Sequence, residues 1–572
     1  MRSPASGHDR RPSSGHRLAS GLTAAIATGL LIGGLLAPGA AFASSSESWT
    51  GGGDGHSWTD SNNWSGGVPQ DGDSVTIAPT ASETAPEVTE VPGISLQDLS
   101  MTNASLAGGA VTVDGDFSWT VSQGQNTLDA PLTVEGSATI GGAGKKITLV
   151  QMTFDGATDV SGTGLLETEF SGAAITNTGR FTIEPGSSVE ANACCANPNK
   201  FVDTGILAVP ASAGGTATLG FMGLSIAGAV DVGRGSTLDV IAGPAMFKAG
   251  IPVSGDGTLR FDTGETVQLA SGVAVGPNAT VELTGNGVFT GAGGFAGHGT
   301  FLWTGGQVEG NLDVGQAVTT TIAGAATKES FSPNGKPITL TLRGSTTVSG
   351  TGPVDLGSAT TLDNEGVLTA KPGTTFEAGI CCASPDRFVN GGTLTVAAGA
   401  SSATFAYLAF LNHGTVKLAS GKLVVKVLSY TQESGVTSLT GGSLSSPLPV
   451  LIKGGTLTGH GTVGAAVVNG GTVKPSTTGG VLTVNGSYQQ TKSGTFATVL
   501  TGTTPGRKFG QLVVNGAAKL AGAIDVTTSH FTPRKGQSFE VMGYRSHAGS
   551  FTRKSGSPTY SVSYAGSVRI RY

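Results

Sequence analysis

The feature that most constrains the fold is a short unit that recurs along the chain, with the pattern apolar-x-Asn/Asp-x-Gly-x-apolar-x-apolar. This unit or a close variant occupies residues 175–183, 201–209, 362–370, 388–396, 411–418 and 468–475. Asn, Asp and Gly adopt the turn conformations that β-branched residues resist, and the alternating residues that follow predict a strand with one buried face. We therefore interpret each unit as a tight turn followed by a short strand.

The spacing of the units predicts how they assemble. Asn177 and Asp203 are 26 positions apart, as are Asn364 and Asn390, and Asn412 follows Asn390 by 22 positions. A unit of this length cannot bury its apolar face alone, so we expect each unit to form one coil of a solenoid and to stack on the next. Two interpretations of the Asn residues stay open. In the first, the Asn side chains form an amide ladder through the stack. In the second, Asn occurs at these positions only because it tolerates the turn conformation.

A longer duplication contains these units. Residues 191–209 match residues 378–396 with a constant offset of 187, and residues 160–164 match 348–352. We predict a parallel β-helix over residues 81–478 with two related halves, at about 140–300 and 330–478. The 93 glycines and the 12% of charged residues in this 572-residue chain are typical of short strands with small turns and unlike an ordinary enzyme domain.

The two ends of the predicted helix differ from its middle. Residues 44–80 hold three of the five Trp residues, Trp49, Trp58 and Trp64, and we predict that they cap the apolar cross-section of the first coil. The alternative is that these rings stack on a sugar. Residues 479–572 have longer and more polar strand-like runs, which predict a C-terminal β segment that closes the stack, with a separate binding module as the alternative.

Both ends resemble a known family. Residues 49–77 resemble the W-x-G-G…W-x-x-x-x-N-W…P-x-x-G-D-x-V-x-I start of bacterial autotransporter-associated β-helix repeat proteins, and residues 457–475 and 482–551 resemble their closing coil and the segment after it. The chain departs from that family because it shows no translocator barrel pattern. The resemblance implies a right-handed parallel β-helix on an exported, adhesin-like protein, and it implies no catalytic residues. The predicted fold is thus an all-β, right-handed parallel β-helix (solenoid) with an N-terminal cap and a C-terminal β segment.

Residues 1–43 are predicted to be a signal peptide. They combine a basic start, an apolar run over 22–37 and the small-x-small sequence Ala41-Phe42-Ala43. A retained membrane anchor is the alternative, and no later stretch is expected to span a membrane as a helix. Removing the signal (+3) from the whole chain (−6) leaves about −9, so the charge gives no reason to expect nucleic acid as a partner. We expect a secreted or cell-surface protein with an unknown surface or matrix ligand, for which a glycan is one candidate.

The four cysteines form two vicinal pairs, Cys194–Cys195 and Cys381–Cys382. The 187 residues between the pairs correspond to about eight coils, or ~35–40 Å, which is far beyond disulfide reach. The candidate disulfides are therefore the vicinal ones, which export favours although such a ring is strained. Free buried thiols, or a redox or metal role, are the alternatives.

Other motifs favour no particular chemistry. Gly-His-Gly occurs around His298 and His460, a motif that polygalacturonases also use, but the chain has no adjacent Asp pair and both motifs fit the G-x-G-T turn of the family. The Gly-rich sequence before Asp54 is a single half of a calcium nonapeptide repeat. We thus predict no catalytic, cofactor-binding or metal-binding residues and expect a non-enzymatic adhesin-like or structural protein. The alternatives are a polysaccharide-active β-helix enzyme and a carbohydrate-binding protein.

Overall fold

The structure is a computed structural model that describes residues 44–572 except 82–83, 171, 193–198, 263, 265, 270–271, 358, 380–385, 478–479 and 557–558. The described chain is all-β, with 55% strand. Its one short helix is the 3-10 turn η1 (Ser61–Asn63). The predicted signal peptide and the four candidate disulfide residues Cys194, Cys195, Cys381 and Cys382 lie outside the described residues.

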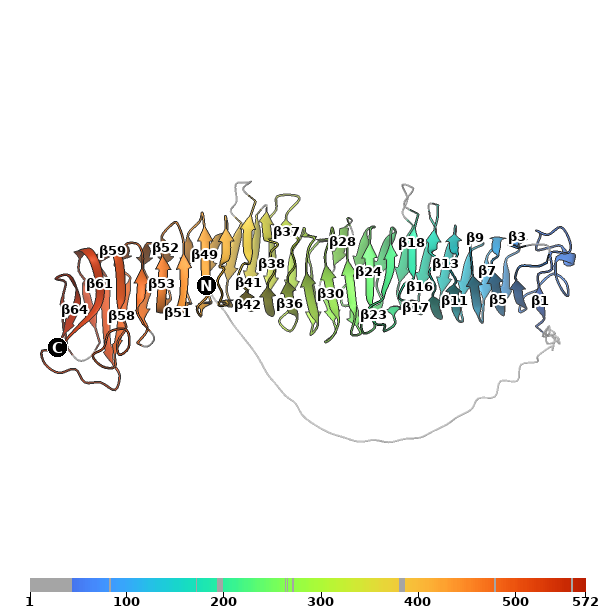
Figure 1. The fold of residues 1–572 in the computed structure, drawn as a ribbon. Helices are drawn as coiled ribbons and strands as arrows, with labels where there is room; N and C mark the ends of the chain where they lie inside the picture. Colours follow the sequence, from blue (N-terminus) through green and yellow to red (C-terminus); the bar gives the residue numbers. More distant parts are fainter. Residues whose placement is uncertain are drawn as a thin grey trace, which may run out of the picture. The chain divides into compact units, whose positions relative to one another are not determined.

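The strands form a parallel β-solenoid of about 18 turns. Through most of the stack, each strand pairs in parallel with the third strand before it and the third after it, as β13 (Gln151–Phe154) does with β10 (Leu132–Val134) and β16 (Ala174–Asn177). A coil therefore contributes one strand to each of three sheets. We name them sheet A, which contains β11 (Ala138–Gly141), sheet B, which contains β12 (Lys145–Thr148), and sheet C, which contains β13. Figure 1 shows successive coils following the sequence from blue to red.

The core lies between the three sheets. Alternate residues of each strand are buried, as in β17 (Arg180–Ile183), where Phe181 and Ile183 point inward. The Phe181 ring of sheet A meets two rings of sheet C, with centroid distances of 5.7 Å to Phe154 and 5.2 Å to Phe201. Aromatic pairs at such distances add to the area that burial removes from water. The period-2 pattern in the sequence therefore corresponds to one continuous apolar interior.

The motif Asn residues form the amide ladder. The Nδ2 of Asn364 donates to the Oδ1 of Asn390 at 2.7 Å, and the Nδ2 of Asn390 donates to the Oδ1 of Asn412 at 2.7 Å. In the earlier copy, the Nδ2 of Asn177 donates to the Oδ1 of Asp203 at 2.5 Å. All five side chains are fully buried, so each amide satisfies a polar group that water cannot reach.

Glycine is required in the motif for a different reason from the one that the sequence suggested. Gly205 and Gly392 do not adopt a positive φ. A Cβ on Gly205 would instead lie 2.0 Å from the carbonyl oxygen of Gly179, and one on Gly392 would lie 2.1 Å from that of Gly366. The glycines of successive coils thus form a column in which each coil rests on the backbone of the one before it. Close approach between coils, and not a left-handed turn, is what excludes a side chain here.

The duplicated segments lie on different sheets. Asn177 ends β16 of sheet C, and its counterpart Asn364 ends β41 (Thr360–Asn364) of sheet A. The two strands are 25 strands apart (41 − 16), which is eight coils and one further strand. The sequence predicted copies about eight coils apart. The extra strand is tolerated because each sheet offers the same parallel ladder to an incoming strand.

The N-terminal segment covers the edges of the first strands. The backbone N–H of Trp58 donates to the carbonyl of Thr89 in β3 (Glu87–Val91), the first strand of sheet B, at 2.9 Å. The N–H of Gly72 donates to the carbonyl of Ser95 in β4 (Ile94–Leu96), the first strand of sheet C, at 2.8 Å. These bonds occupy backbone groups that a sheet edge otherwise leaves free.

The C-terminal strands become longer and end in an antiparallel pairing. β59 (Leu512–Leu520) and β61 (Ser538–Gly549) each bend across sheets C and A. β64 (Ser567–Arg571) then pairs antiparallel with β61 and with β63 (Ser561–Ser563). None of the helical structure in the described part of the chain is long and apolar enough to cross a membrane.

Candidate ligand-binding groove

A groove lies on the outer face of sheet C. It crosses five neighbouring strands, β19 (Lys200–Asp203), β22 (Gly223–Ile226), β25 (Ala245–Phe247), β28 (Thr266–Leu269) and β31 (Val288–Thr290), and has a volume of about 510 Å³. Five strands at ~4.8 Å spacing give the groove a length of about 19 Å along the stack. Its shape suits an extended ligand better than a compact one.

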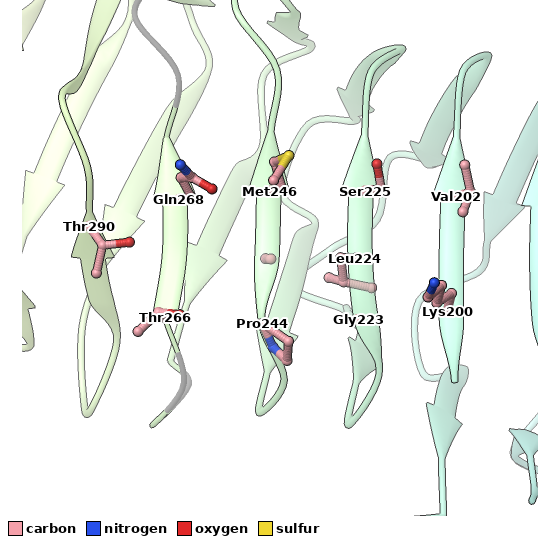
Figure 2. A pocket seen from close by; sticks show the side chains of 11 residues that line it. Lys200, Val202, Gly223, Leu224, Ser225, Pro244, Met246, Thr266, Gln268 and Thr290 are labelled. Carbon is pink, nitrogen blue, oxygen red and sulfur yellow. The ribbon is translucent and has the colours of Figure 1, made fainter. Parts of the chain in front are cut away.

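The strand register arranges the lining side chains in two rows. The first row runs through Val202, Ser225, Met246, Gln268 and Thr290, which are paired from strand to strand. The second row begins with Lys200, which is paired with Gly223 on the next strand. The backbone N–H of Leu224, beside Gly223, donates to the carbonyl of Pro244, and Thr266 continues the row. Outward positions alternate with core positions along each strand, so every coil adds one residue to each row. Figure 2 shows these side chains on neighbouring strands.

Small residues make the face concave. Gly223 has no side chain, and a Cβ there would meet its nearest atom, the carbonyl oxygen of Asn199, at an ordinary 3.6 Å. The space above it is therefore open and bounded by the longer side chains of Lys200 and Met246. Met246 is 46% exposed, which is unusual for a large apolar side chain. The groove thus has an apolar floor at its middle and polar groups around it.

The chemistry of the groove favours binding of a polyhydroxylated or amide-containing chain. Ser225, Thr266 and Thr290 offer hydroxyls, Gln268 offers a carboxamide, and Lys200 is the one charged side chain among the lining residues. Hydroxyls and amides both donate and accept hydrogen bonds. Apolar groups beside a few convergent polar groups are the usual composition of a binding site.

A second hollow of about 400 Å³ adjoins the groove on sheet C, and β31 contributes to both. Its polar wall is formed by Gln307, whose Nε2 donates to the Oε2 of Glu329 at 2.8 Å. The outward row then continues through acids on three successive strands, Glu329, Asp355 and Glu377. Burial, with smaller contributions from the charges of Glu377 and Glu329, raises the pKa of Asp355. Sheet C thus presents one lysine at the groove and three acids on strands further along the stack.

The described residues contain no group of three or more His, Cys, Asp or Glu side chains placed to hold a metal ion. The acids on sheet C form a row along the strands and do not converge on a point. A row of like charges suits a surface that repels anions or binds cations weakly.

The predicted Trp residues lie inside the N-terminal cap, away from the groove. Trp49, Trp58 and Trp64 are only 4%, 0% and 4% exposed. The Trp64 ring contacts both others, at centroid distances of 5.0 Å to Trp49 and 4.7 Å to Trp58, and its Nε1 donates to the carbonyl of Trp58 at 2.7 Å. No ring face is open to a sugar, so the burial favours capping over ligand stacking.

The two Gly-His-Gly motifs are not brought together. His298 follows β32 (Gly293–Gly297) and is exposed, whereas His460 lies within β53 (Thr456–Gly464) several coils later. Asp54 accepts backbone N–H bonds from His56 and Ser57 at 2.9 and 2.8 Å, which lower the pKa of its carboxyl to about 2. It therefore serves as a turn residue within the cap.

Sequence reasoning missed a pair of buried lysines. The Nζ of Lys146 donates to the carbonyls of Gly141, Gly142 and Gly164 at 3.0–3.3 Å, and the Nζ of Lys328 donates to three carbonyls at 2.8–3.3 Å. Both lysines are fully buried, and burial lowers the pKa of Lys146 to about 8. The signal was present as a repeated sequence, Gly-Gly-Ala-Gly-Lys-Lys at 141–146 and Ala-Gly-Ala-Ala-Thr-Lys at 323–328.

Comparison with known proteins adds no identity to this geometry. No protein-family model matches the chain, and no curated protein matches it. The resemblance of its two ends to autotransporter-associated β-helix repeats therefore stays a resemblance, and what the structure shows is a β-solenoid built from repeated coils.

Proposed function

We propose that this chain is an exported, adhesin-like β-solenoid that binds an extended glycan in the groove on sheet C. The single observation that carries the proposal is the pair of lining rows across β19 to β31, which repeat with the spacing of the coils. A linear polymer can contact several coils of such a surface at once. Export itself is supported by the signal-like sequence of residues 1–43.

The composition of the groove supports binding more than turnover. Among the described lining residues the only titratable side chain is that of Lys200, whereas glycoside hydrolysis usually uses a pair of carboxyl groups on either side of the bond. The hydroxyl and amide side chains of Ser225, Gln268 and Thr290 can bond sugar hydroxyls, while Met246 can contact the apolar face of a ring. These contacts give affinity without a reaction.

A glycan-binding screen with residues 44–572, followed by one groove-filling variant, tests this proposal. Gly223→Phe places a ring in open space, because the glycine has no positive φ and its Cβ has no close neighbour. We expect it to reduce affinity for any bound glycan by about tenfold or more, a loss of about 1.4 kcal/mol.

Gly391→Phe is the matched control, because its Cβ would lie 3.7 Å from the nearest atom, at an exposed turn outside the groove. It should leave binding unchanged. Equal loss of affinity in both variants, or binding that survives Gly223→Phe, would exclude the groove as the binding surface.

The acidic row on sheet C supports a second candidate, a polysaccharide-active enzyme. Asp355 has a raised pKa and lies between two other carboxylates on neighbouring strands, which is the kind of pair that can supply a general acid and a base. The test is release of reducing ends from glycans that bind. Loss of release in Asp355→Asn, with normal release in Asp363→Asn, would favour this candidate over pure binding.

A further inference from the structure

The two ends of the coil stack carry opposite charge. Residues 44–144 contain 13 Asp or Glu and no Lys or Arg, whereas residues 479–572 contain 11 Lys or Arg and 2 Asp or Glu. The formal charge is thus −13 in the first segment and +9 in the last. Strand pairing places the first segment in the opening coils and the last segment in the closing strands, so the separation in sequence is also a separation along the ladder.

Most of these charges are exposed and lack a partner of opposite sign among the described residues. None of the described carboxylates of residues 44–144 takes part in an ion pair, since the first pair along the chain involves Lys145. In the last segment Arg569 pairs with Glu540, and the other ten cations are exposed and form no ion pair with any residue that the structure describes. The exposed acids of the first segment are Asp54, Asp71, Glu87, Glu90, Asp114, Asp116, Asp129 and Glu135.

The strand edges also differ between the two ends. The N-terminal cap covers the opening strands of sheets B and C with backbone hydrogen bonds. At the other end, within the described chain, no strand pairs with the outer edge of residues 546–549 of β61 in sheet A, or with that of β62 (Arg553–Ser555) in sheet B. Arg545, Arg553 and Lys554 are exposed on or next to these edges. Edge strands that carry cations avoid pairing with one another, because like charges repel.

We propose that copies of this chain associate end to end, with the acidic N-terminal end of one copy against the basic C-terminal end of the next. Opposite charges attract between unlike ends and repel between like ends, so the contact has one allowed orientation. A contact between two different surfaces of the same chain is heterologous, and it extends into a linear filament when the rotation does not close.

Charge complementarity within the chain is what identifies a second copy as the occupant. An anionic polymer would satisfy the basic end alone and would leave the acidic end of −13 without a role. A second copy of the chain compensates the charge of both ends with a single type of contact. The central coils do not compete for either end, because their ion pairs, such as Arg343 with Asp313 and Lys453 with Glu433, already combine both signs.

Sedimentation velocity of residues 44–572, which form one compact unit, tests the association. We expect species larger than one chain at about 0.01 M salt and a single monomeric species at about 1 M salt, where the Debye length falls from about 30 to about 3 Å. A chain that is monomeric at every salt concentration and at the highest soluble concentration would overturn the proposal.

Two charge-reversed variants make the test specific to the ends. The basic-end variant carries Arg545→Glu, Arg553→Glu and Lys554→Glu, and the acidic-end variant carries Glu87→Lys, Glu90→Lys and Asp129→Lys, all at exposed positions. Each variant alone should associate at least about tenfold more weakly, because the three reversals reduce the charge of the altered end from +9 to +3 or from −13 to −7 and place like charges in the contact. An equimolar mixture should associate again, because the unaltered basic end of one variant can contact the unaltered acidic end of the other.

The matched control reverses three exposed cations of the central coils, Lys417→Glu, Lys422→Glu and Lys426→Glu, and should associate like the original chain. Failure of the mixture to recover association, or an equal loss in the control, would show that net charge and not end-to-end contact governs it. A chain that stays monomeric but binds dextran sulfate through its last segment would assign the basic end to an anionic polymer instead, and would also overturn the proposal.

Discussion

At the scale of single residues, the most informative position is the one acid in the amide ladder. Asp203 occupies the place that Asn390 holds in the second copy, and burial raises the pKa of its carboxyl. A carboxyl with a raised pKa binds its proton more tightly in the folded chain. Its contribution to stability is therefore greatest below the ordinary value of 3.8 and is lost as the pH rises through the folded pKa.

Asp203→Asn should consequently stabilise the fold at pH 7, by about 1 kcal/mol, since a neutral amide replaces a buried charge and keeps the bond to Asn177. Urea unfolding at pH 4 and pH 7 measures the effect, which should be larger at pH 7. The reciprocal variant, Asn390→Asp, should destabilise at pH 7 and recover toward pH 4. A destabilised Asp203→Asn at pH 7 would contradict the role assigned to burial.

The buried lysines give a second prediction at this scale. Lys146→Met removes an ammonium that satisfies three backbone carbonyls and leaves those oxygens without that donor in a dry interior. We expect a loss of about 2 kcal/mol in unfolding free energy, and a similar loss for Lys328→Met. Lys417→Met, at an exposed position, should change stability by less than about 0.5 kcal/mol. Equal midpoints of thermal unfolding for all three would disprove a structural role of the ammonium groups.

At the scale of elements, the glycine column decides how closely coils stack. Gly392 lies between β44 (Arg387–Asn390) and β45 (Thr393–Val396), with the carbonyl of Gly366 at 2.1 Å from the position of a Cβ. A methyl group there meets backbone, which cannot rotate away as a side chain can. The coil must shift as a whole, and the ladder bond between Asn364 and Asn390 shifts with it.

Gly392→Ala should therefore cost about 1–3 kcal/mol or more, whereas Gly391→Ala next to it should be nearly neutral because its Cβ meets nothing closer than 3.7 Å. Chemical denaturation of the two variants side by side measures the difference. If Gly391→Ala costs as much as Gly392→Ala, conformational freedom of the loop matters more than contact between the coils.

At the scale of the whole molecule, the separation of charge affects the stability of the coils as well as their association. The opening coils contain acids without compensating cations, so these charges repel each other within the folded stack. Central coils contain both signs and several ion pairs. In a solenoid each coil contacts only its neighbours, so such local differences are not averaged over the chain.

Raising the salt concentration from about 0.01 M to about 1 M should therefore slow amide hydrogen exchange in β3 to β9 (Gln125–Asp129) more than in β44 to β49 (Lys422–Lys426). The expected ratio is severalfold, because screening removes repulsion only where one sign dominates. Uniform slowing along the chain would indicate a general salt effect and not the local acid excess. A variant such as Glu135→Gln should reproduce part of the effect at low salt.

The repeated unit determined by itself that the chain forms stacked parallel coils, because a turn followed by an alternating strand can bury its apolar face only against a copy of itself. It also predicted the Asn ladder as one of two possibilities, since polar groups at a fixed corner of each coil must meet. The groove was not predictable in the same way. Gly223, Met246 and Gln268 carry no shared motif and become neighbours only through register between strands.

Tertiary structure alone decided three further points. It placed the duplicated segments on different sheets, because the offset of 25 strands is not a multiple of three. It buried Trp49, Trp58 and Trp64, whose sequence pattern fitted both a cap and a binding face. It also placed the acidic and basic segments at opposite ends of one ladder, so that a net charge of −6 conceals two strongly charged ends. In each case the local sequence is compatible with more than one arrangement, and only the stacking of distant coils determines which arrangement forms.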